Sequence, residues 1–552
     1  MDTDRYWNVA VVKLVQSEGA PFFDDNETVL GLLARAAAER PDYVYLRQGL
    51  QEITCAELAA RVERAATGLA ALGVRPGDHV AVMMGHHIDH VITFFAIMRV
   101  GAVLVPVNVA LKGPGLVYQI EHSAPALIVA DADFAEVLAE PIIAAQAKGA
   151  RAEVVWRLPD NSHELPEPGY TLALVLKGGS APAPAIDQHW SDLRIILYTS
   201  GTTGAPKGVQ MSDRMVQATA LGSIWLSDMQ PGSVLHFWDP IYHVFGAEVL
   251  VLALMVPVTL HMVPRFSASN FWSEVREAGA SHIHFVGGVL QLLLKQPPSK
   301  LDRSHGARIA WGGGCPRDIW ETFEQRFGLE IREGYGMTET SSFSTINPGG
   351  SKAGKLGSIG VGVGYYQVEV VDETGNPVPT GVPGEIRVAE REPGVLTVGY
   401  YANREATNAA LREGWLYTGD LAHVDADGFI IYYGRKKDSL RRRGENISAW
   451  EVERVIADHP EVAECALIGV VNEMGDEDLK IFVRRIEGSH LTGLDLLAWC
   501  TERMAKFQVP RFVRFIKEFR KTPTQRIQKQ FLSDSINDFD HDAEAPRARV
   551  TQ

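Results

Sequence analysis

The sequence Tyr198-Thr-Ser-Gly-Thr-Thr-Gly-Ala-Pro-Lys-Gly208 follows a predicted strand, Arg194 to Tyr198, and combines Ser and Thr hydroxyls with three glycines and one lysine. Glycines let backbone amides approach an anion closely, hydroxyls donate hydrogen bonds, and the lysine supplies positive charge. The segment departs from a Walker loop, because Pro206 precedes the lysine and Gly208 replaces the Ser or Thr of that loop. It predicts a different phosphate-binding loop, and the alternative is an ordinary surface loop.

Further segments that combine glycine with polar or charged side chains follow the loop along the chain. In order, they are Pro240-Ile-Tyr-His-Val-Phe-Gly246, Gly312-Gly-Gly314, Tyr335-Gly-Met-Thr-Glu-Thr340, Tyr417-Thr-Gly-Asp420 and Gly434-Arg-Lys-Lys-Asp438. Each alone has a structural explanation, such as a turn or a buried core histidine at His243. Their occurrence together and in this order favours a functional role for these segments over a purely structural one.

Together with the loop, these segments resemble the motifs of the adenylate-forming family, which includes acyl-CoA synthetases, peptide-synthetase adenylation domains and beetle luciferases. The resemblance extends over roughly residues 33 to 532. It implies an α/β fold: a large N-terminal domain of α/β layers with a β-rich lobe, and a small mobile α+β C-terminal domain. The implied activity joins a carboxylic acid to AMP, using ATP and Mg²⁺, and then transfers the acyl group to coenzyme A.

The resemblance also assigns binding roles, residue by residue. The implied phosphate loop consists of Thr199, Ser200, Gly201, Thr202, Thr203, Gly204 and Lys207. The implied nucleotide site consists of Gly312, Gly313, Gly314, Tyr335, Gly336, Met337, Thr338, Asp420 and Arg435. The implied acyl pocket consists of His243, Val244, Gly246, Phe285, Gly287, Gly288, Gly312 and Gly336. The implied coenzyme A tunnel consists of Arg442, Arg443, Gly444, Glu445 and Asn446.

Catalysis in this family depends on magnesium, on the phosphate loop and on a lysine of the C-terminal domain. This domain rotates about a hinge. The resemblance places the metal ligand at Glu339 and the hinge at Lys437. The implied catalytic residues are Lys207, Thr338, Glu339, Arg526 and Lys529.

The C-terminal lysine motif departs from the family pattern. The chain reads Lys521-Thr-Pro-Thr-Gln-Arg-Ile-Gln-Lys529, so Arg526 stands where the family has lysine. A planar guanidinium cannot replace a compact ammonium in a pocket shaped for it. The sequence therefore predicts weak or absent adenylation, with acyl-AMP supplied by a separate adenylating enzyme. A complete two-step ATP-dependent ligase, in which Lys529 or a reshaped loop substitutes, is the alternative.

Two further functions are compatible with the same residues. A luciferase-like oxygenase shares the implied fold, and a nucleotide-binding protein without turnover would also fit Arg526.

Small residues at Phe285-Val-Gly-Gly-Val289 and Trp311-Gly-Gly-Gly314 favour a bulky, ring-containing acid. Backbone packing explains the same glycines equally well. The sequence does not determine the oligomeric state and is compatible with an oligomer.

Alternating helical and extended patterns predict α/β layers, beginning with a helix that a Thr54–Glu57 capping box opens and Gly73 ends. The segment from Gln367 to Ala389 predicts a β-rich lobe, and Asp425 to Gly428 predicts a hairpin turn. The predicted domains are an adenylate- and acyl-binding domain at residues 1–433 and a mobile C-terminal domain at residues 434–533. Residues 534–552 are polar and patternless, which predicts a disordered tail.

Composition excludes several classes of protein. A net charge of −15 argues against a broad basic face for nucleic acid. Cys55, Cys315, Cys465 and Cys500 form no Cys-x-x-Cys pair, so neither a zinc site nor a disulfide framework is indicated. Apolar runs are too short for a membrane span. We therefore expect a cytoplasmic protein that binds no nucleic acid and acts on a small carboxylic acid or its acyl-adenylate with coenzyme A.

Overall fold

The computed structural model describes residues 22–159, 164–199, 205–347, 355–436, 439–442, 445–471, 477–504, 506–521 and 527–543. The chain divides into two compact units, one within residues 1–368 and 388–416 and the other within residues 369–387 and 417–552. The proposed boundary near Tyr433 stays a prediction. The predicted site residues outside the described ranges are Ser200, Gly201, Thr202, Thr203, Gly204, Lys437, Arg443, Gly444 and Arg526.

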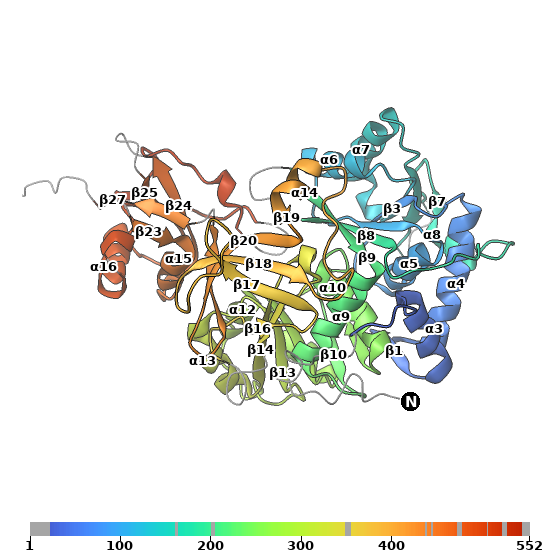
Figure 1. Cartoon of the computed structure of the whole chain (residues 1–552), viewed down its shortest axis with the longest axis horizontal. Coiled ribbons are helices and arrows are strands. Elements are labelled where there is room, and N and C mark those ends of the chain that lie inside the picture. The colour runs from blue at the N-terminus through green and yellow to red at the C-terminus, as the bar shows by residue number, and fades with distance from the viewer. Residues whose placement is uncertain are drawn as a thin grey trace, which may run out of the picture. The chain divides into compact units, whose positions relative to one another are not determined.

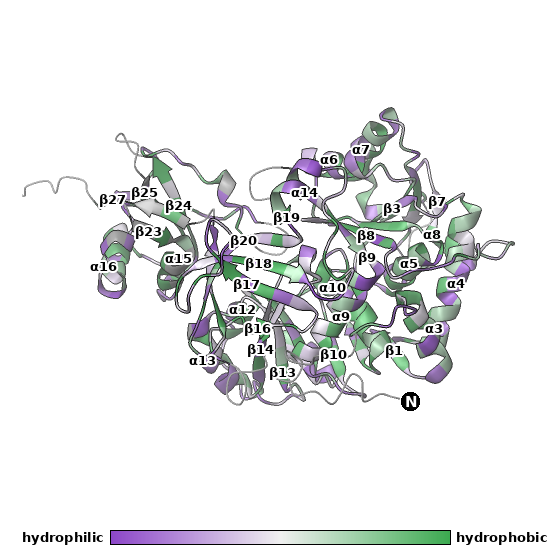
Figure 2. Cartoon of the chain, viewed as in Figure 1, coloured by the Kyte–Doolittle hydropathy of each residue, from purple (hydrophilic) through white to green (hydrophobic). Residues whose placement is uncertain are grey.

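A first layer of the first unit is built on a sheet of order β7-β6-β5-β3-β4-β8-β9, the β8 sheet (Figure 1). Its pairs are parallel except for the antiparallel pair of β8 and β9. Strands that are covered on both faces are rich in Val, Ile and Leu, as β8 is here (Figure 2). The strands are β3 (His79–Met83), β4 (Val103–Pro106), β5 (Leu127–Asp131), β6 (Glu153–Arg157), β7 (Tyr170–Thr171), β8 (Leu193–Thr199) and β9 (Lys207–Ser212).

A second layer is built on a sheet of order β16-β15-β14-β13-β12-β10-β11-β1-β2, the β13 sheet. Strands β11, β10, β12, β13 and β14 pair in parallel, so their carboxyl ends lie at one edge. The strands are β1 (Val44–Gln48), β2 (Gln51–Thr54), β10 (Val234–Phe237), β11 (Thr259–Met262), β12 (His282–Val286), β13 (Ile309–Gly313), β14 (Glu330–Tyr335), β15 (Thr345–Asn347) and β16 (Val361–Gly362).

Helices of the first unit show the patterns expected for their positions. Thr54 and Glu57 form the predicted capping box at the start of α4, and Gly73 follows the helix with a φ of 78°. The apolar helix α10 is buried almost all round against α9, whereas α13 carries many hydrophilic residues (Figure 2). The helices are α3 (Val29–Glu39), α4 (Cys55–Ala71), α5 (Ile88–Arg99), α6 (Pro114–Ser123), α7 (Ala135–Ala147), α8 (Leu172–Lys177), α9 (Asp213–Ser227), α10 (Val244–Met255), α11 (Phe271–Glu277), α12 (Val289–Leu294), α13 (Arg317–Phe327) and α14 (Arg404–Ala410).

The predicted β-rich lobe corresponds to a sheet of order β17-β18-β20-β19, with β21 also paired to β20. The turn predicted at Asp425 to Gly428 joins β20 to β21, with the Gly428 amide donating to the Asp425 carbonyl. The strands are β17 (Tyr366–Val371), β18 (Gly384–Glu390), β19 (Leu411–Arg412), β20 (Trp415–Val424) and β21 (Ile430–Arg435).

The C-terminal part of the second unit is a small α+β fold, as predicted. A sheet of order β24-β25-β26-β27 packs its apolar side chains against α15 and α16, and β22 and β23 form a hairpin. The elements are β22 (Ser439–Arg442), β23 (Glu445–Ser448), α15 (Ala449–Ala457), β24 (Val462–Val471), β25 (Glu477–Arg485), α16 (Gly493–Arg503), β26 (Phe512–Phe515) and β27 (His541–Asp542). The predicted α/β fold class, with a β-rich lobe and a small C-terminal fold, is confirmed.

The prediction of a disordered tail is wrong for residues 534–543. Strand β27 pairs antiparallel with β26, and Asp542 forms an ion pair with Arg511 at 3.1 Å. Asp540 contacts Arg514 at the same distance. These carboxylates gave the tail its polar composition, and in the fold their charges are matched by arginines on the neighbouring strand.

Candidate functional site

The carboxyl ends of four parallel strands bring several predicted segments to one edge of the β13 sheet. Trp238 and Asp239 follow β10, Gly287 follows β12, and Gly336 follows β14. The strand β13 itself ends in Gly312 and Gly313. In open α/β sheets, ligands bind beyond the carboxyl ends of parallel strands. The adjacency could not be read from the sequence, because it depends on the strand order.

Two of the predicted glycines are required by close backbone contact. A Cβ atom on Gly312 would lie 1.8 Å from the carbonyl oxygen of Phe285, and one on Gly336 would lie 2.0 Å from that of Ser342. Any side chain would therefore displace the backbone. Packing alone explains these glycines, so they no longer indicate a bulky acid.

The phosphate-loop segment joins two antiparallel strands. Thr199, at the end of β8, pairs with Lys207, at the start of β9. The strand before the loop is thus confirmed, but a second strand follows it. A Walker loop leads into a helix instead, whose N-terminus assists anion binding. Here the anion-binding groups available from the sequence are the loop amides, the hydroxyls and Lys207.

Tyr400 connects two predicted catalytic residues and was not identified from the sequence. Its hydroxyl donates to Glu339 Oε1 at 2.8 Å, and its ring centroid lies 4.9 Å from Lys207 Nζ. Tyr400 forms a β-bridge with Val209, and the Tyr401 amide donates to the Gly208 carbonyl. The signal for Tyr400 is therefore long-range strand pairing, which no local motif reveals.

Thr338 and Glu339 lie in a short 3₁₀ turn, Thr338–Thr340, and both are buried. The turn is held by a reciprocal pair in which the Met337 amide donates to Thr340 Oγ1 and Thr340 Oγ1 donates to the Met337 carbonyl. The Thr397 amide donates to the Glu339 carbonyl at 3.0 Å. Lys207, Glu339 and Tyr400 are thus brought together within the first unit.

A buried carboxyl group supports the backbone of the predicted nucleotide site. Glu333, on β14, accepts hydrogen bonds from the amides of Gly314 and Cys315 at 2.9 and 3.2 Å. Burial raises the pKa of Glu333 from 4.5 to about 8, although these two amides act in the opposite direction. The group is therefore largely protonated at neutral pH in the folded protein.

We expect Glu333→Gln to stabilise the protein at pH 7 by about 3 kcal/mol, because pH 7 lies about 2.5 units above the ordinary pKa of 4.5 and each unit corresponds to roughly 1.4 kcal/mol. The raised pKa favours the folded state below pH 4.5, and this stability is lost as the pH rises toward 8. The amide oxygen of glutamine can still accept from Gly314 and Cys315. Urea unfolding from pH 5 to 8 measures the difference, with the exposed Glu321→Gln as control. An identical pH dependence in wild type and Glu333→Gln would contradict the expectation.

The predicted acyl-pocket residues are spread over the same sheet edge. His243 is the N-cap of α10, its ring lies 5.3 Å from that of Phe245, and Val244 and Gly246 are buried in the first turn. Phe285 is fully buried on β12. Gly287 has a φ of 52°, a Cβ atom added to it would meet no other atom within 4 Å, and Gly288 is exposed.

The predicted ribose-binding residues meet within the second unit. Asp420 on β20 pairs with Arg435 on β21, and Arg435 Nε lies 3.0 Å from Asp420 Oδ1. The Tyr432 hydroxyl donates to the same oxygen at 3.3 Å. Asp420 is buried, and both Arg435 and Tyr432 contact the same oxygen of its carboxyl group.

The predicted tunnel and lysine positions lie in the C-terminal fold. In the backbone register of the β22–β23 hairpin, Arg442 stands opposite Glu445, and Arg441 stands opposite Asn446. Lys529 lies in a 3₁₀ turn, and its Nζ is 2.8 Å from Glu453 Oε1. Lys529 is thus engaged with a carboxylate of its own unit.

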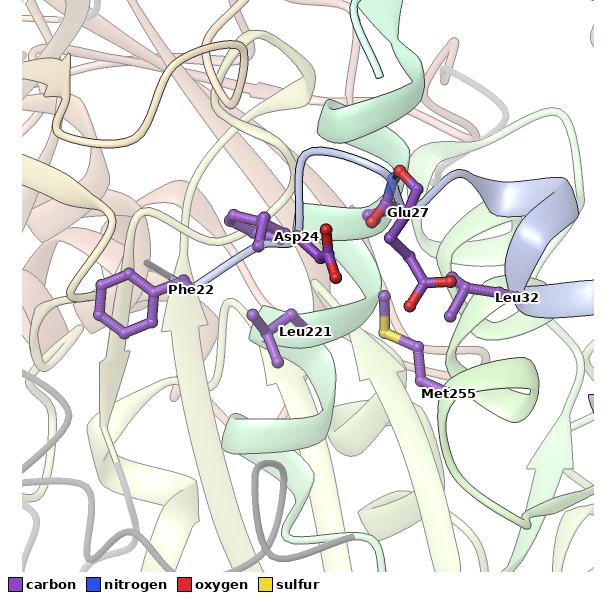
Figure 3. Close-up of a pocket in the computed structure, with 8 residues that line it drawn as sticks. Phe22, Asp24, Glu27, Leu32, Leu221 and Met255 are labelled. Carbon is purple, nitrogen blue, oxygen red and sulfur yellow. Dashed lines mark hydrogen bonds between the residues drawn. The ribbon is translucent and has the colours of Figure 1, made fainter. Parts of the chain in front are cut away.

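A pocket lies apart from the predicted site residues, none of which lines it (Figure 3). It is formed by the segment before α3 together with α3, α9 and the end of α10, and it is lined by Phe22, Phe23, Asp24, Glu27, Leu32, Gln217, Leu221 and Met255.

Within the described ranges, no three His, Cys, Asp or Glu side chains gather into a metal site. No described helix combines the length and apolar composition needed to cross a membrane.

Comparison with known proteins agrees with this geometry. A family model described as AMP-binding enzyme matches residues 33–401, and one described as AMP-binding enzyme C-terminal domain matches residues 451–526. The chain belongs to the AMP-binding enzyme family. Its first unit therefore carries most of the matched AMP-binding segment, and the C-terminal α+β fold carries the second match.

Relatives of this AMP-binding enzyme include several proteins named for coenzyme A chemistry. It is 31% identical to feruloyl-CoA synthase of Amycolatopsis over 90% of the chain and 96% of the relative. It is 28% identical to crotonobetaine/carnitine–CoA ligase of Salmonella paratyphi A over 88% of the chain and 93% of the relative. The ATP-bound structure of MatB from Rhodopseudomonas palustris aligns with a TM-score of 0.80 and 29% identity, covering 91% of this chain and 98% of MatB.

Proposed function

We propose that this AMP-binding enzyme is an acyl-CoA ligase that makes acyl-AMP from a carboxylic acid and ATP and then passes the acyl group to coenzyme A. The observation that carries the proposal is the contact of Tyr400 with both Lys207 and Glu339. It places an ammonium group and a buried carboxylate together beside the proposed phosphate loop. The names of the relatives support the choice of coenzyme A as acceptor.

In the first half-reaction, a carboxylate oxygen of the acid bonds to the α-phosphorus of ATP and pyrophosphate leaves. In the second, the coenzyme A thiol loses its proton, its sulfur bonds to the acyl carbon, and AMP leaves. Both steps depend on positioning and on charge neutralisation. We assign phosphate binding to Thr199 through Gly204 and Lys207, and ribose binding to Asp420 and Arg435.

The donor at Glu339 fits a magnesium ion. Mg²⁺ takes oxygen ligands and usually combines one or two carboxylates with water and substrate phosphates. Glu339 offers one buried carboxylate, already oriented by the Tyr400 hydroxyl. Bound Mg²⁺ would supply charge compensation for the phosphates. The remaining steps rest on the residues of the chain.

For the second half-reaction, we propose a mobile C-terminal domain that begins near residue 434 and rotates about Lys437. Arg442, Arg443, Gly444, Glu445 and Asn446 would then face the coenzyme A thiol arm. Alternation between two domain arrangements is a known way to use one site for two reactions.

The position of Arg526 suggests that adenylation is slow without being lost. The relatives named CoA ligase and CoA synthase favour a chain that carries out both half-reactions, whereas Arg526 carries a guanidinium where the family has an ammonium. The contact of Lys529 with Glu453 gives no support for substitution by that lysine. The second candidate is thus a half-enzyme that receives acyl-AMP from another protein.

Two assays on the same preparation test the proposal. ATP–pyrophosphate exchange with a panel of acids measures the first half-reaction, and thioester formation from synthetic acyl-AMP and coenzyme A measures the second. Both activities support a complete ligase, and thioester formation without exchange supports the half-enzyme. Binding of acyl-AMP without thioester formation would contradict ligase activity, and light emission or oxygen uptake would indicate an oxygenase.

For the substrate, we propose a ring-containing acid. The support is the set of aromatic rings beside the predicted acyl pocket, Phe245, Trp311 and Phe343. Flat rings favour stacked or edge-on contact with other rings. Comparing cinnamate with a linear acid such as decanoate in the exchange assay tests this choice.

A further inference from the structure

A group of buried polar side chains in the first unit adjoins predicted acyl-pocket residues and has no role in the steps above. Each belongs to an element that carries such a residue or touches one. We refer to them as the polar cluster, which consists of Glu248 on α10, His284 on β12, Trp311 on β13 and Ser342 after the 3₁₀ turn. Their exposed fractions are 2% or less.

Each member of the polar cluster has a buried polar atom without a hydrogen-bond partner among the described residues. These atoms are Glu248 Oε1 and Oε2, His284 Nε2, Trp311 Nε1 and Ser342 Oγ. Buried polar groups are nearly always paired, and an unpaired one destabilises the fold. Several such atoms in one region therefore indicate a partner that the protein itself does not provide.

The aromatic rings of the region form a closed circle. The His284 ring lies 4.4 Å from the Trp311 ring and 4.9 Å from the Phe245 ring. Phe343 completes the circle at 5.5 Å from Phe245 and 6.3 Å from Trp311. Ser342 immediately precedes Phe343, so its hydroxyl belongs to the same region.

The orientation of His284 is fixed by its neighbours. Its Nδ1 contacts Asp239 Oδ2, and its carbonyl accepts from Trp238 Nε1 at 3.1 Å. This contact turns Nε2, the ring nitrogen on the other side, away from Asp239 and leaves it for a second hydrogen bond. Asp239 therefore acts as a positioning residue for His284.

Backbone strain occurs at the same place. Ser341 and Ser342 have φ values of 49° and 67°, in the left-handed region that non-glycine residues seldom adopt. Such strain persists where surrounding structure enforces it and is concentrated at ligand-binding sites. The Ser342 carbonyl also lies so close to Gly336 that a Cβ atom there would be 2.0 Å from it.

Glu248 is expected to be uncharged. Burial raises the pKa of its carboxyl group well above the usual range. The hydroxyls of Ser342 and Ser223 lie near enough to lower the pKa in part, without the geometry of a hydrogen bond to either carboxyl oxygen. A neutral carboxyl group both donates and accepts, so it suits a hydroxyl or carbonyl group better than a cation.

We propose that the polar cluster binds an uncharged hydrogen-bonding substituent, a hydroxyl or carbonyl group, on the acyl part of the substrate. This inference rests on the proposed ligase function and specifies its substrate class. A site that pairs a substrate hydroxyl discriminates strongly against the analogue without it, because its own polar groups are then left unpaired.

The test compares two pairs of acids, cinnamate with 4-hydroxycinnamate and decanoate with 10-hydroxydecanoate. A fifth acid, 4-trimethylammonio-cinnamate, carries a cation in place of the hydroxyl. Each acid is assayed with the wild type, with Glu248→Leu and with the control Glu324→Leu. Glu324 is a half-buried carboxyl on α13, outside the proposed site. We expect kcat/KM for at least one hydroxy acid to exceed that of its parent by about 10- to 100-fold. Glu248→Leu should reduce this ratio to near one, whereas Glu324→Leu should keep the ratio.

Binding provides a readout that does not depend on turnover. Calorimetry with the nonreactive acyl-sulfamoyl adenosines of 4-hydroxycinnamate and cinnamate should show the same preference and the same loss in Glu248→Leu. If no acid is turned over but this preference persists, the ligase function fails and the polar cluster stands. Equal binding of the hydroxy and parent analogues, no binding of either, a preference that survives in Glu248→Leu, or selection of the trimethylammonium acid would overturn the inference. Thermal unfolding checks that Glu248→Leu is folded.

Discussion

Glu339→Gln is expected to lower ATP–pyrophosphate exchange by about 10²- to 10³-fold. The substitution removes the negative charge proposed to hold Mg²⁺ but keeps an oxygen at the position of Oε1. That oxygen can still accept from the Tyr400 hydroxyl, which lies 2.8 Å from Glu339 Oε1. The fold should therefore be preserved, and the loss should be specific to the metal-dependent half-reaction.

Exchange rates over a range of Mg²⁺ concentrations measure the effect, and higher Mg²⁺ should restore part of the activity. Glu330→Gln is the matched control, because this partly exposed glutamate lies at the start of β14 and forms an ion pair with Arg332, away from the proposed metal ligand. Exchange by Glu339→Gln within threefold of wild type would rule out the proposed metal ligand.

Arg526→Lys is expected to raise the exchange rate by about 10²- to 10³-fold, because it restores the ammonium group of the family motif. Thioester formation from supplied acyl-AMP should stay unchanged, since the lysine acts in the first half-reaction of the family. Both rates are measured on the same preparation.

The control is Arg520→Lys, a substitution of the same kind in the same unit. The Arg520 guanidinium carbon lies 3.9 Å from the Phe531 ring centroid, which indicates a packing role. Fast exchange by the wild-type protein, or no gain in Arg526→Lys, would contradict the assignment of Arg526 to the lysine position.

Local patterns predicted the elements well where the signal was itself local. The capping box at Thr54 and the turn at Asp425 to Gly428 were found because each depends on side chains a few residues apart. The convergence of β10, β12, β13 and β14 at one edge was not predictable, because strand order depends on contacts between distant segments.

The same distinction applies to the candidate site. Motif resemblance selected Lys207 and Glu339, and the structure brings both into contact with one tyrosine. Tyr400 and the polar cluster around Glu248 were missed, since their importance lies in burial and in partners across the fold. The polar tail was misjudged for a related reason: composition records charge, but not whether Arg511 and Arg514 lie opposite it.

The pairing of β27 with β26 also protects the C-terminal fold. An uncovered strand presents a row of free N–H and C=O groups on which another chain can assemble. Residues 541–542 occupy that row on β26, and the ion pairs of Asp538 and Asp540 with Arg514 hold the segment against the strand. Strand β27 thus opposes self-association through β26. A protein shortened before residue 534 would expose the edge of β26 to pairing with another chain, even if its catalytic residues were intact.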